Sequence, residues 1–290
     1  MNDSKQLIGS MLQVGGAAKS SACAGRLRAG VRRLFACPAS RQGGSAPLER
    51  PEVILAAFLV LATFLMAGAD YWLGLWMQSF PSHLLGLSRT ITDLGEGVQV
   101  LVLSGVILIV SIFVPVARLR RRAVVGINAV TAAAAFVFLS VAGGGTTALL
   151  LKYAIGRARP EALGAEGYLQ FRPFSMDSDF SAFPSGHSAT AGAMAVSLAL
   201  VFPRLRPIIM PAGVLICVSR QLVGAHWSSD TVMGWGLGVA FTFWVAHVFA
   251  RRGLVFGYDS DGGLRRRDCR SLFGSRWWLS GQGRGKAARL

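Results

Sequence analysis

The chain has 290 residues, of which 52% are hydrophobic and 15% carry a charge, against about 25% charged residues in a soluble domain. This composition excludes an ordinary soluble protein, and its apolar content excludes a chain that is disordered throughout. The net charge of +16 does not require a nucleic-acid partner, because 13 of those charges lie in residues 1–50 and 251–290.

Six apolar segments are long enough, or nearly so, to cross a bilayer as helices, because a span needs about 20 residues. They are predicted at 53–70, 97–117, 123–151, 187–202, 208–224 and 231–250. An open sheet would leave unpaired backbone groups in hydrocarbon, so the predicted fold is all-α, a bundle of six transmembrane helices. Residues 51–252 are expected to form the transmembrane domain. Residues 1–50 and 253–290 are expected to be basic cytoplasmic tails, disordered or bound at the membrane surface.

Aromatic side chains recur at near-helical spacing between the first two segments, at Tyr71, Trp72, Trp76 and Phe80. We favour an aromatic belt at the membrane surface for residues 71–96. The alternative is a lid or a lipid-entry element beside an active site.

The distribution of Lys and Arg predicts the orientation of the bundle. If both termini are cytoplasmic, the segments on that side hold 24 of the 30 basic residues. The ends of the third to sixth segments then meet at the opposite, non-cytoplasmic face. Ionisable residues at those ends are costly in a membrane protein and are therefore candidates for function.

Two of the candidate groups are cationic or lie at a helix start. Lys152 and Arg159 are seven residues apart and share a face if the helix continues; without an anion they repel each other. The alternative is a pair of snorkelling cations at the end of a span.

Ser185, Gly186 and His187 open the fourth segment, where Ser185 or a neighbour caps the helix. A capped N-terminus with a glycine suits a phosphate-like anion, and His187 can exchange a proton.

The third group is Arg220, His226 and Asp230, at the end of the fifth segment and the start of the sixth. If the chain after Gly224 is helical, His226 and Asp230 lie at i and i+4 on one face. An Asp bonded to one imidazole nitrogen leaves the other nitrogen as a nucleophile. Arg220 offers a planar fork to phosphate oxygens. Each group alone has a structural explanation, but together at one membrane face they suit phosphoryl transfer. No His, Cys, Asp or Glu cluster has metal-ligand spacing, so no metal or other cofactor is expected.

These three motifs, Lys152-x6-Arg159-Pro160, Pro184-Ser185-Gly186-His187 and Ser219-Arg220-x5-His226-x3-Asp230, resemble the signature of the type 2 phosphatidic acid phosphatase superfamily. Order and spacing fit at every motif position, and the resemblance covers about residues 50–250. It implies that His226 forms a phosphohistidine, that Asp230 orients His226 and that His187 is the general acid. It further implies that the phosphoryl group is bound by Lys152, Arg159, Ser185, Gly186 and Arg220. Arg157 lies outside the signature and is expected at a lipid headgroup or the membrane surface.

The predicted function is therefore a metal-independent phosphatase of a lipid phosphate or diphosphate in the bacterial inner membrane, with its site facing the periplasm. Candidate substrates are undecaprenyl diphosphate, phosphatidylglycerol phosphate, phosphatidic acid and lipid A. The alternatives are a lipid phosphotransferase with the same site and an inactive lipid-binding or transport protein. A vanadate-dependent haloperoxidase shares the constellation, but those proteins are soluble. The sequence does not indicate an oligomeric state.

Overall fold

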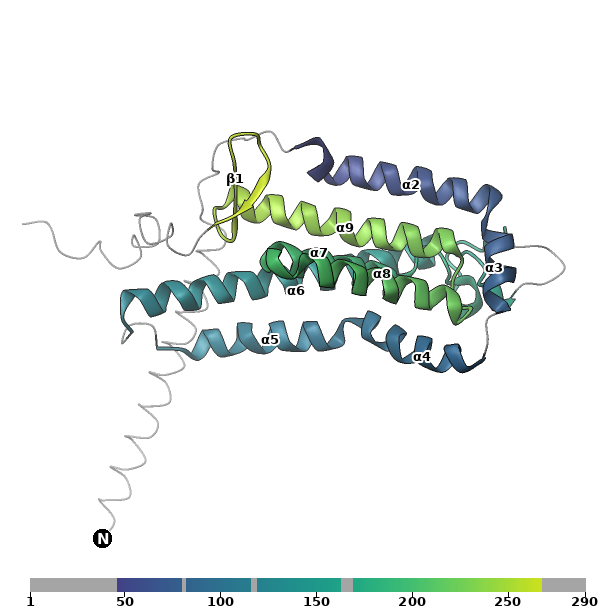
Figure 1. The fold of residues 1–290 in the computed structure, drawn as a ribbon, viewed down its shortest axis with the longest axis horizontal. Helices are drawn as coiled ribbons and strands as arrows, with labels where there is room; N and C mark the ends of the chain where they lie inside the picture. Colours follow the sequence, from purple (N-terminus) through teal and green to yellow (C-terminus); the bar gives the residue numbers. More distant parts are fainter. Residues whose placement is uncertain (1–45, 80–81, 116–118, 163–168, 268–290) are drawn as a thin grey trace, which may run out of the picture.

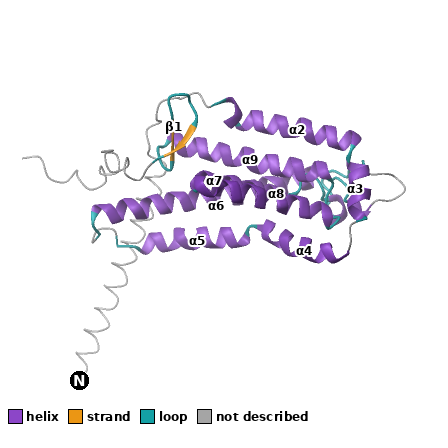
Figure 2. Ribbon diagram, viewed as in Figure 1, coloured by secondary structure: helices purple, strands orange, loops and turns teal. Residues whose placement is uncertain are grey.

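The structure is a computed structural model that describes residues 46–79, 82–115, 119–162 and 169–267. Long helices run side by side along one direction, with the short helix α3 across one end and a hairpin at the other (Figures 1 and 2). The α-helices are α2 (Pro51–Gly68), α3 (Asp70–Gln78), α4 (Ser82–Asp93), α5 (Val98–Phe113), α6 (Arg121–Ile155), α7 (Gly186–Val201), α8 (Arg206–Leu222) and α9 (Ser228–Arg251). The strands are β1 (Phe256–Tyr258) and β2 (Leu264–Arg266).

The chain is a multi-pass membrane protein. Five apolar helices in the described part of the chain are long enough to cross a membrane, at Pro51–Gly68, Ser88–Phe113, Arg122–Ile155, Pro203–Leu222 and Ser228–Arg251. They match five of the six predicted segments. The remaining one, predicted at 187–202, is the apolar helix α7, which has 16 residues and a length of about 24 Å. A six-span bundle therefore stays a prediction.

Helix α7 is the centre of the bundle, with α6, α8 and α9 packed around it and 11 of its 16 residues buried. Small residues bring its backbone against α9. A Cβ atom on Gly192 would lie 2.7 Å from the carbonyl oxygen of Trp235, and one on Gly238 would collide with the carbonyl oxygen of Ala189. This close packing joins the two helix starts, because the Ser185 N–H donates to the Asp230 carbonyl oxygen at 3.0 Å.

Helix α6 ends at a glycine that no other residue can replace without strain. Gly156 has φ 66°, its N–H donates to the Lys152 carbonyl oxygen, and a Cβ atom there would collide with the Arg172 carbonyl. Residues beyond it run extended, with hydrogen bonds from Ala158 N–H to Gln170 and from Arg159 N–H to Asp179. Lys152 and Arg159 would share one face only if the helix continued, and that condition is not met, because the helix ends at Ile155 between them.

The hairpin lies within the segment expected to be a C-terminal tail from residue 253. Phe256 is 1% exposed, with its ring 4.8 Å from that of Phe136. His247 at the end of α9 bonds the Tyr258 hydroxyl at 3.1 Å and the Glu49 carbonyl oxygen at 2.9 Å. The folded part thus continues to residue 267, because these apolar and hydrogen-bonding groups seal the end of the bundle. Residues 1–45 and 268–290 of the expected tails lie outside the described residues.

We predict that Phe256→Ala lowers the stability of the bundle by about 3–5 kcal/mol, the usual cost of deleting a buried phenyl group. The measurement is thermal unfolding in detergent. The control is Phe113→Ala, at a side chain that is 67% exposed, which should change the midpoint little. Equal midpoints for both variants would mean that the hairpin does not belong to the core.

Candidate active site

Four helix ends meet at the end of the bundle where α3 lies (Figure 1), and each carries predicted site residues. Lys152 is in the last turn of α6 and Arg220 is in the last turn of α8. Ser185 is the N-cap of α7, and Asp230 is in the first turn of α9. The three motifs are therefore brought together by antiparallel helices, as expected from their positions in the spans.

His226 and Asp230 are neighbours, but not through a helix that contains both. Helix α9 begins at Ser228, so His226 lies in the preceding turn, where its Nδ1 is 3.7 Å from Asp230 Oδ2. The same carboxylate oxygen accepts the Trp227 N–H at 2.8 Å and so caps α9. Burial lowers the pKa of His226 to about 4, with the Asp230 carboxylate opposing the shift. The imidazole is consequently neutral at pH 7, the form in which a ring nitrogen can attack.

The start of α7 lies against the other site residues. The Ser185 hydroxyl accepts the Ser188 N–H at 3.4 Å, which confirms the predicted N-cap. A Cβ atom on Gly186 would be 3.9 Å from Lys152 Nζ, so the ammonium lies over this turn. His187 is partly exposed, with its Nε2 3.9 Å from Glu96 Oε1, which comes from the 3-10 helix Leu94–Glu96. Glu96 belongs to none of the three sequence motifs.

Three cations gather here with few partners. Lys152, Arg159 and Arg220 repel one another electrostatically, and His187 and His226 lie within their field. Arg159 donates to the Ser181 hydroxyl at 3.1 Å, and the Nε atoms of Arg159 and Arg220 are buried without a hydrogen-bond partner. Among the described residues, none lies within ion-pair distance of Lys152 or Arg220. Such a cluster can bind an anion with several negative oxygens.

Metal ligands are not grouped in the same way. Within the residues that the structure describes, no three His, Cys, Asp or Glu side chains are arranged to hold a metal ion. The chemistry of this donor set is that of cations and imidazoles.

Arg157 lies elsewhere than its position in the sequence predicted. It was expected at a headgroup or the membrane surface, but its side chain is fully buried. It donates to Asp230 Oδ1 at 2.6 Å, to the Ser229 hydroxyl at 2.7 Å and to Asp70 Oδ2 at 3.0 Å. Asp70 was not singled out either, although a single acid directly after an 18-residue apolar helix is a recognisable signal.

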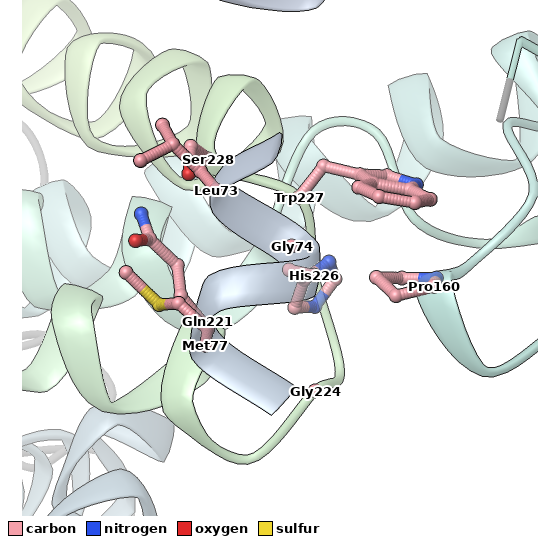
Figure 3. Close-up of a pocket in the computed structure, with 9 residues that line it drawn as sticks. All are labelled: Leu73, Gly74, Met77, Pro160, Gln221, Gly224, His226, Trp227 and Ser228. Carbon is pink, nitrogen blue, oxygen red and sulfur yellow. The ribbon is translucent and has the colours of Figure 1, made fainter. Parts of the chain in front are cut away.

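Helix α3 forms one wall of a pocket beside His226 (Figure 3). It contributes Leu73, Gly74 and Met77, opposite Pro160 and the turn between α8 and α9. A Cβ atom on Gly74 would lie 2.9 Å from the Trp227 ring, so a glycine is needed for α3 to pack here. Trp72 and Trp76 of α3 are 69% and 56% exposed. The helix thus combines an exposed aromatic face with a face that lines the pocket, and Phe80 lies outside the described residues.

The chain is similar to a protein family and to several known proteins. Residues 129–254 match the model of the PAP2 superfamily. The lipid A 1-phosphatase of Rhizobium johnstonii is 44% identical over 128 residues, which are 44% of this chain and 52% of that protein. The undecaprenyl-diphosphatase of Sulfolobus acidocaldarius is 28% identical over 204 residues, covering 66% of this chain and 87% of that protein.

A solved structure is also similar, the transmembrane PAP2 type phosphatidylglycerolphosphate phosphatase from Bacillus subtilis. Its TM-score is 0.48 at 23% identity, over 68% of this chain and 94% of that chain. This chain spans about half the length of the lipid A 1-phosphatase from Rhizobium johnstonii. The matched segment holds Lys152, His187, Arg220, His226 and Asp230, so residues 129–254 are similar to the PAP2 superfamily, the family that the three motifs resemble.

Proposed function

We propose that the protein is a membrane lipid phosphatase that works without a metal ion, through a phosphohistidine. The observation that carries the proposal is the group of three cations, Lys152, Arg159 and Arg220, gathered around the start of α7 beside a neutral His226. Arg220 is buried and the other two cations are partly buried, and cations that repel one another in such a site are unfavourable unless an anion joins them. A phosphoryl group supplies that charge and accepts hydrogen bonds from each cation and from the Gly186 turn.

In the proposed reaction, the three cations and the Ser185–Gly186 turn bind the phosphoryl oxygens. The free Nε2 atom of His226 attacks phosphorus, and the bond from phosphorus to the lipid oxygen breaks. His187 gives its proton to the departing oxygen. Water then attacks the phosphohistidine, its proton passes to His187, and inorganic phosphate leaves. The Asp230 carboxylate, with Oδ2 3.7 Å from Nδ1 of His226, orients the imidazole and stabilises the positive charge of the intermediate.

The names of the relatives favour lipid A as the first substrate to test. The relative from Rhizobium johnstonii, at 44% identity, is a lipid A 1-phosphatase, and the one from Sulfolobus acidocaldarius, at 28%, is an undecaprenyl-diphosphatase. Phosphatidylglycerol phosphate and phosphatidic acid complete the panel. The exposed aromatic face of α3 favours a lipid as the substrate, because Trp side chains are enriched at the membrane interface.

We further propose that α7 also crosses the membrane, so that the chain has six spans, and that this membrane is the bacterial inner membrane. Both basic ends would be cytoplasmic and the site would face the periplasm. The transmembrane domain would comprise residues 51–252, preceded by the basic segment 1–50 and followed by the basic segment 253–290. In support, Arg204 and Arg206 lie at the start of α8, one helix length from Arg220 at the site end.

We predict that purified protein releases phosphate from one of the four lipid classes in the presence of EDTA. His226→Ala should lower that rate by about 10⁴-fold or more, because it removes the nucleophile. The matched control is His247→Gln, at the opposite end of α9, which should keep most of the activity. Substantial release by His226→Ala would contradict the assignment of the nucleophile, and a requirement for added metal would contradict the mechanism.

Orthovanadate should inhibit this activity as a mimic of the phosphoryl group. Arg220→Gln should weaken vanadate binding about 10- to 100-fold, the loss expected for one charged hydrogen bond. Arg172→Gln is the control, because that guanidinium lies over the Phe180 ring, 4.3 Å from its centroid. Binding constants that stay equal to the unmodified protein's in Arg220→Gln would remove Arg220 from the phosphate site.

An epitope inserted after Met176, in the exposed loop before α7, should be labelled from the periplasm in intact spheroplasts. The same epitope inserted after Ser260, in the hairpin turn, should be labelled only after the membrane is permeabilised. The reverse pattern would invert the proposed topology.

A further inference from the structure

We propose that Asp70 and Arg157 are positioning residues of this active site, which fix the Asp230 carboxylate beside His226 and keep a net negative charge behind it. The inference rests on the proposed function, because it concerns the orientation and charge of the same imidazole. It adds helix α3, which carries Asp70, to the elements that build the site.

The hydrogen bonds fix the direction of the Asp230 carboxylate. Arg157 holds Oδ1 at 2.6 Å, and the Trp227 N–H holds Oδ2 at 2.8 Å. Oδ2 is also the oxygen that faces His226 Nδ1. Because each oxygen has its own donor, the carboxylate cannot rotate away from the imidazole without breaking a charged hydrogen bond in a buried site.

Asp70 fixes Arg157 in turn. Its Oδ2 accepts from Arg157 at 3.0 Å and from the Ser229 hydroxyl, and its Oδ1 accepts the Ser229 N–H at 2.9 Å. The guanidinium is therefore held by α3 on one side and by the start of α9 on the other. Asp70 also places a negative charge at the N-terminus of α9, where the helix dipole favours it.

The charges of this set do not cancel. Asp70, Arg157 and Asp230 all have side chains with 0% exposure, and together they carry one net negative charge. Without Asp70, the positive charge of Arg157 would cancel the negative charge of Asp230. The net negative charge matters because the other groups that act on His226 include the cations Arg220 and Lys152, as well as the neighbouring His187. The net negative charge opposes the effect of these cations when His226 becomes positive on binding phosphorus.

The test compares Asp70→Asn, Arg157→Gln and the double variant in the lipid phosphatase assay. Asp70→Asn should lower kcat by about 10- to 100-fold with little change in KM, the size usual for a supporting residue. Arg157→Gln should lower kcat as well. The acid limb of the kcat profile, where the His226 nucleophile is lost by protonation, should move in opposite directions in the two variants.

The signs follow from the charges. Removing the anion Asp70 lowers the pKa of His226 further, so the acid limb moves to lower pH. Removing the cation Arg157 raises that pKa, so the limb moves to higher pH, and the double variant should return it toward the original position. Loss of structure alone cannot produce opposite shifts. If one single variant does not fold, the direction in which the acid limb moves in the other variant tests the positioning role.

The controls are Asp261→Asn in the hairpin turn and Arg172→Gln in the loop before α7, which should leave kcat and its pH dependence unchanged. An acid limb that stays in place, or moves the same way in both variants, would overturn the positioning role. That result is distinct from failure of the proposed function, in which the unmodified protein releases no phosphate from any lipid.

Discussion

One buried guanidinium joins the segments that build the site. Arg157 follows the end of α6, and it binds Asp70 at the start of α3 and Asp230 at the start of α9. A charge removed from water is unfavourable by several kcal/mol unless it is paired and hydrogen-bonded. The extended chain after Gly156 and the starts of α3 and α9 must therefore be in place together. The site is consequently built as a unit rather than one side chain at a time.

The packing of α7 places the proposed catalytic groups, His187 and His226, beside that buried set of charges. Its small residues let the backbones of α7 and α9 touch at Gly192 and Gly238, and a hydrogen bond then joins Ser185 to Asp230. A larger side chain at either glycine would separate the two helix starts. His187 and His226, which follow Gly186 and precede Ser228, would move apart with them. Helix packing within the bundle thus sets the spacing of residues at its end.

The sequence was sufficient to predict the helical bundle and the meeting of the three motifs. Long apolar runs indicate membrane spans directly. The alternation of basic loops predicts that the ends of α6, α7, α8 and α9 that carry the motifs lie at the same end of the bundle. Two local premises were wrong, because Gly156 stops α6 before Arg159 and because α9 starts after His226. A single glycine in a left-handed conformation ends a helix, and so changes which residues share a face, without changing the hydropathy pattern. The contact of Asp70 with Arg157 is also long-range, and no local pattern encodes a partner 87 residues away.

Three arginines of the site differ in their partners, and that difference separates two kinds of role. Arg157 uses both terminal nitrogens on Asp70, Asp230 and Ser229, so it has little capacity left for an anion from outside. The Nε donors of all three arginines are buried without a hydrogen-bond partner, so the difference lies in the terminal nitrogens. Arg159 uses one of them on the Ser181 hydroxyl, and Arg220 forms no ion pair with a described residue. Terminal nitrogens that are not engaged by the protein can donate to an anion. The same residue type therefore supports the buried Asp70–Arg157–Asp230 set where its terminal nitrogens are bonded, and can bind an anion where they are not.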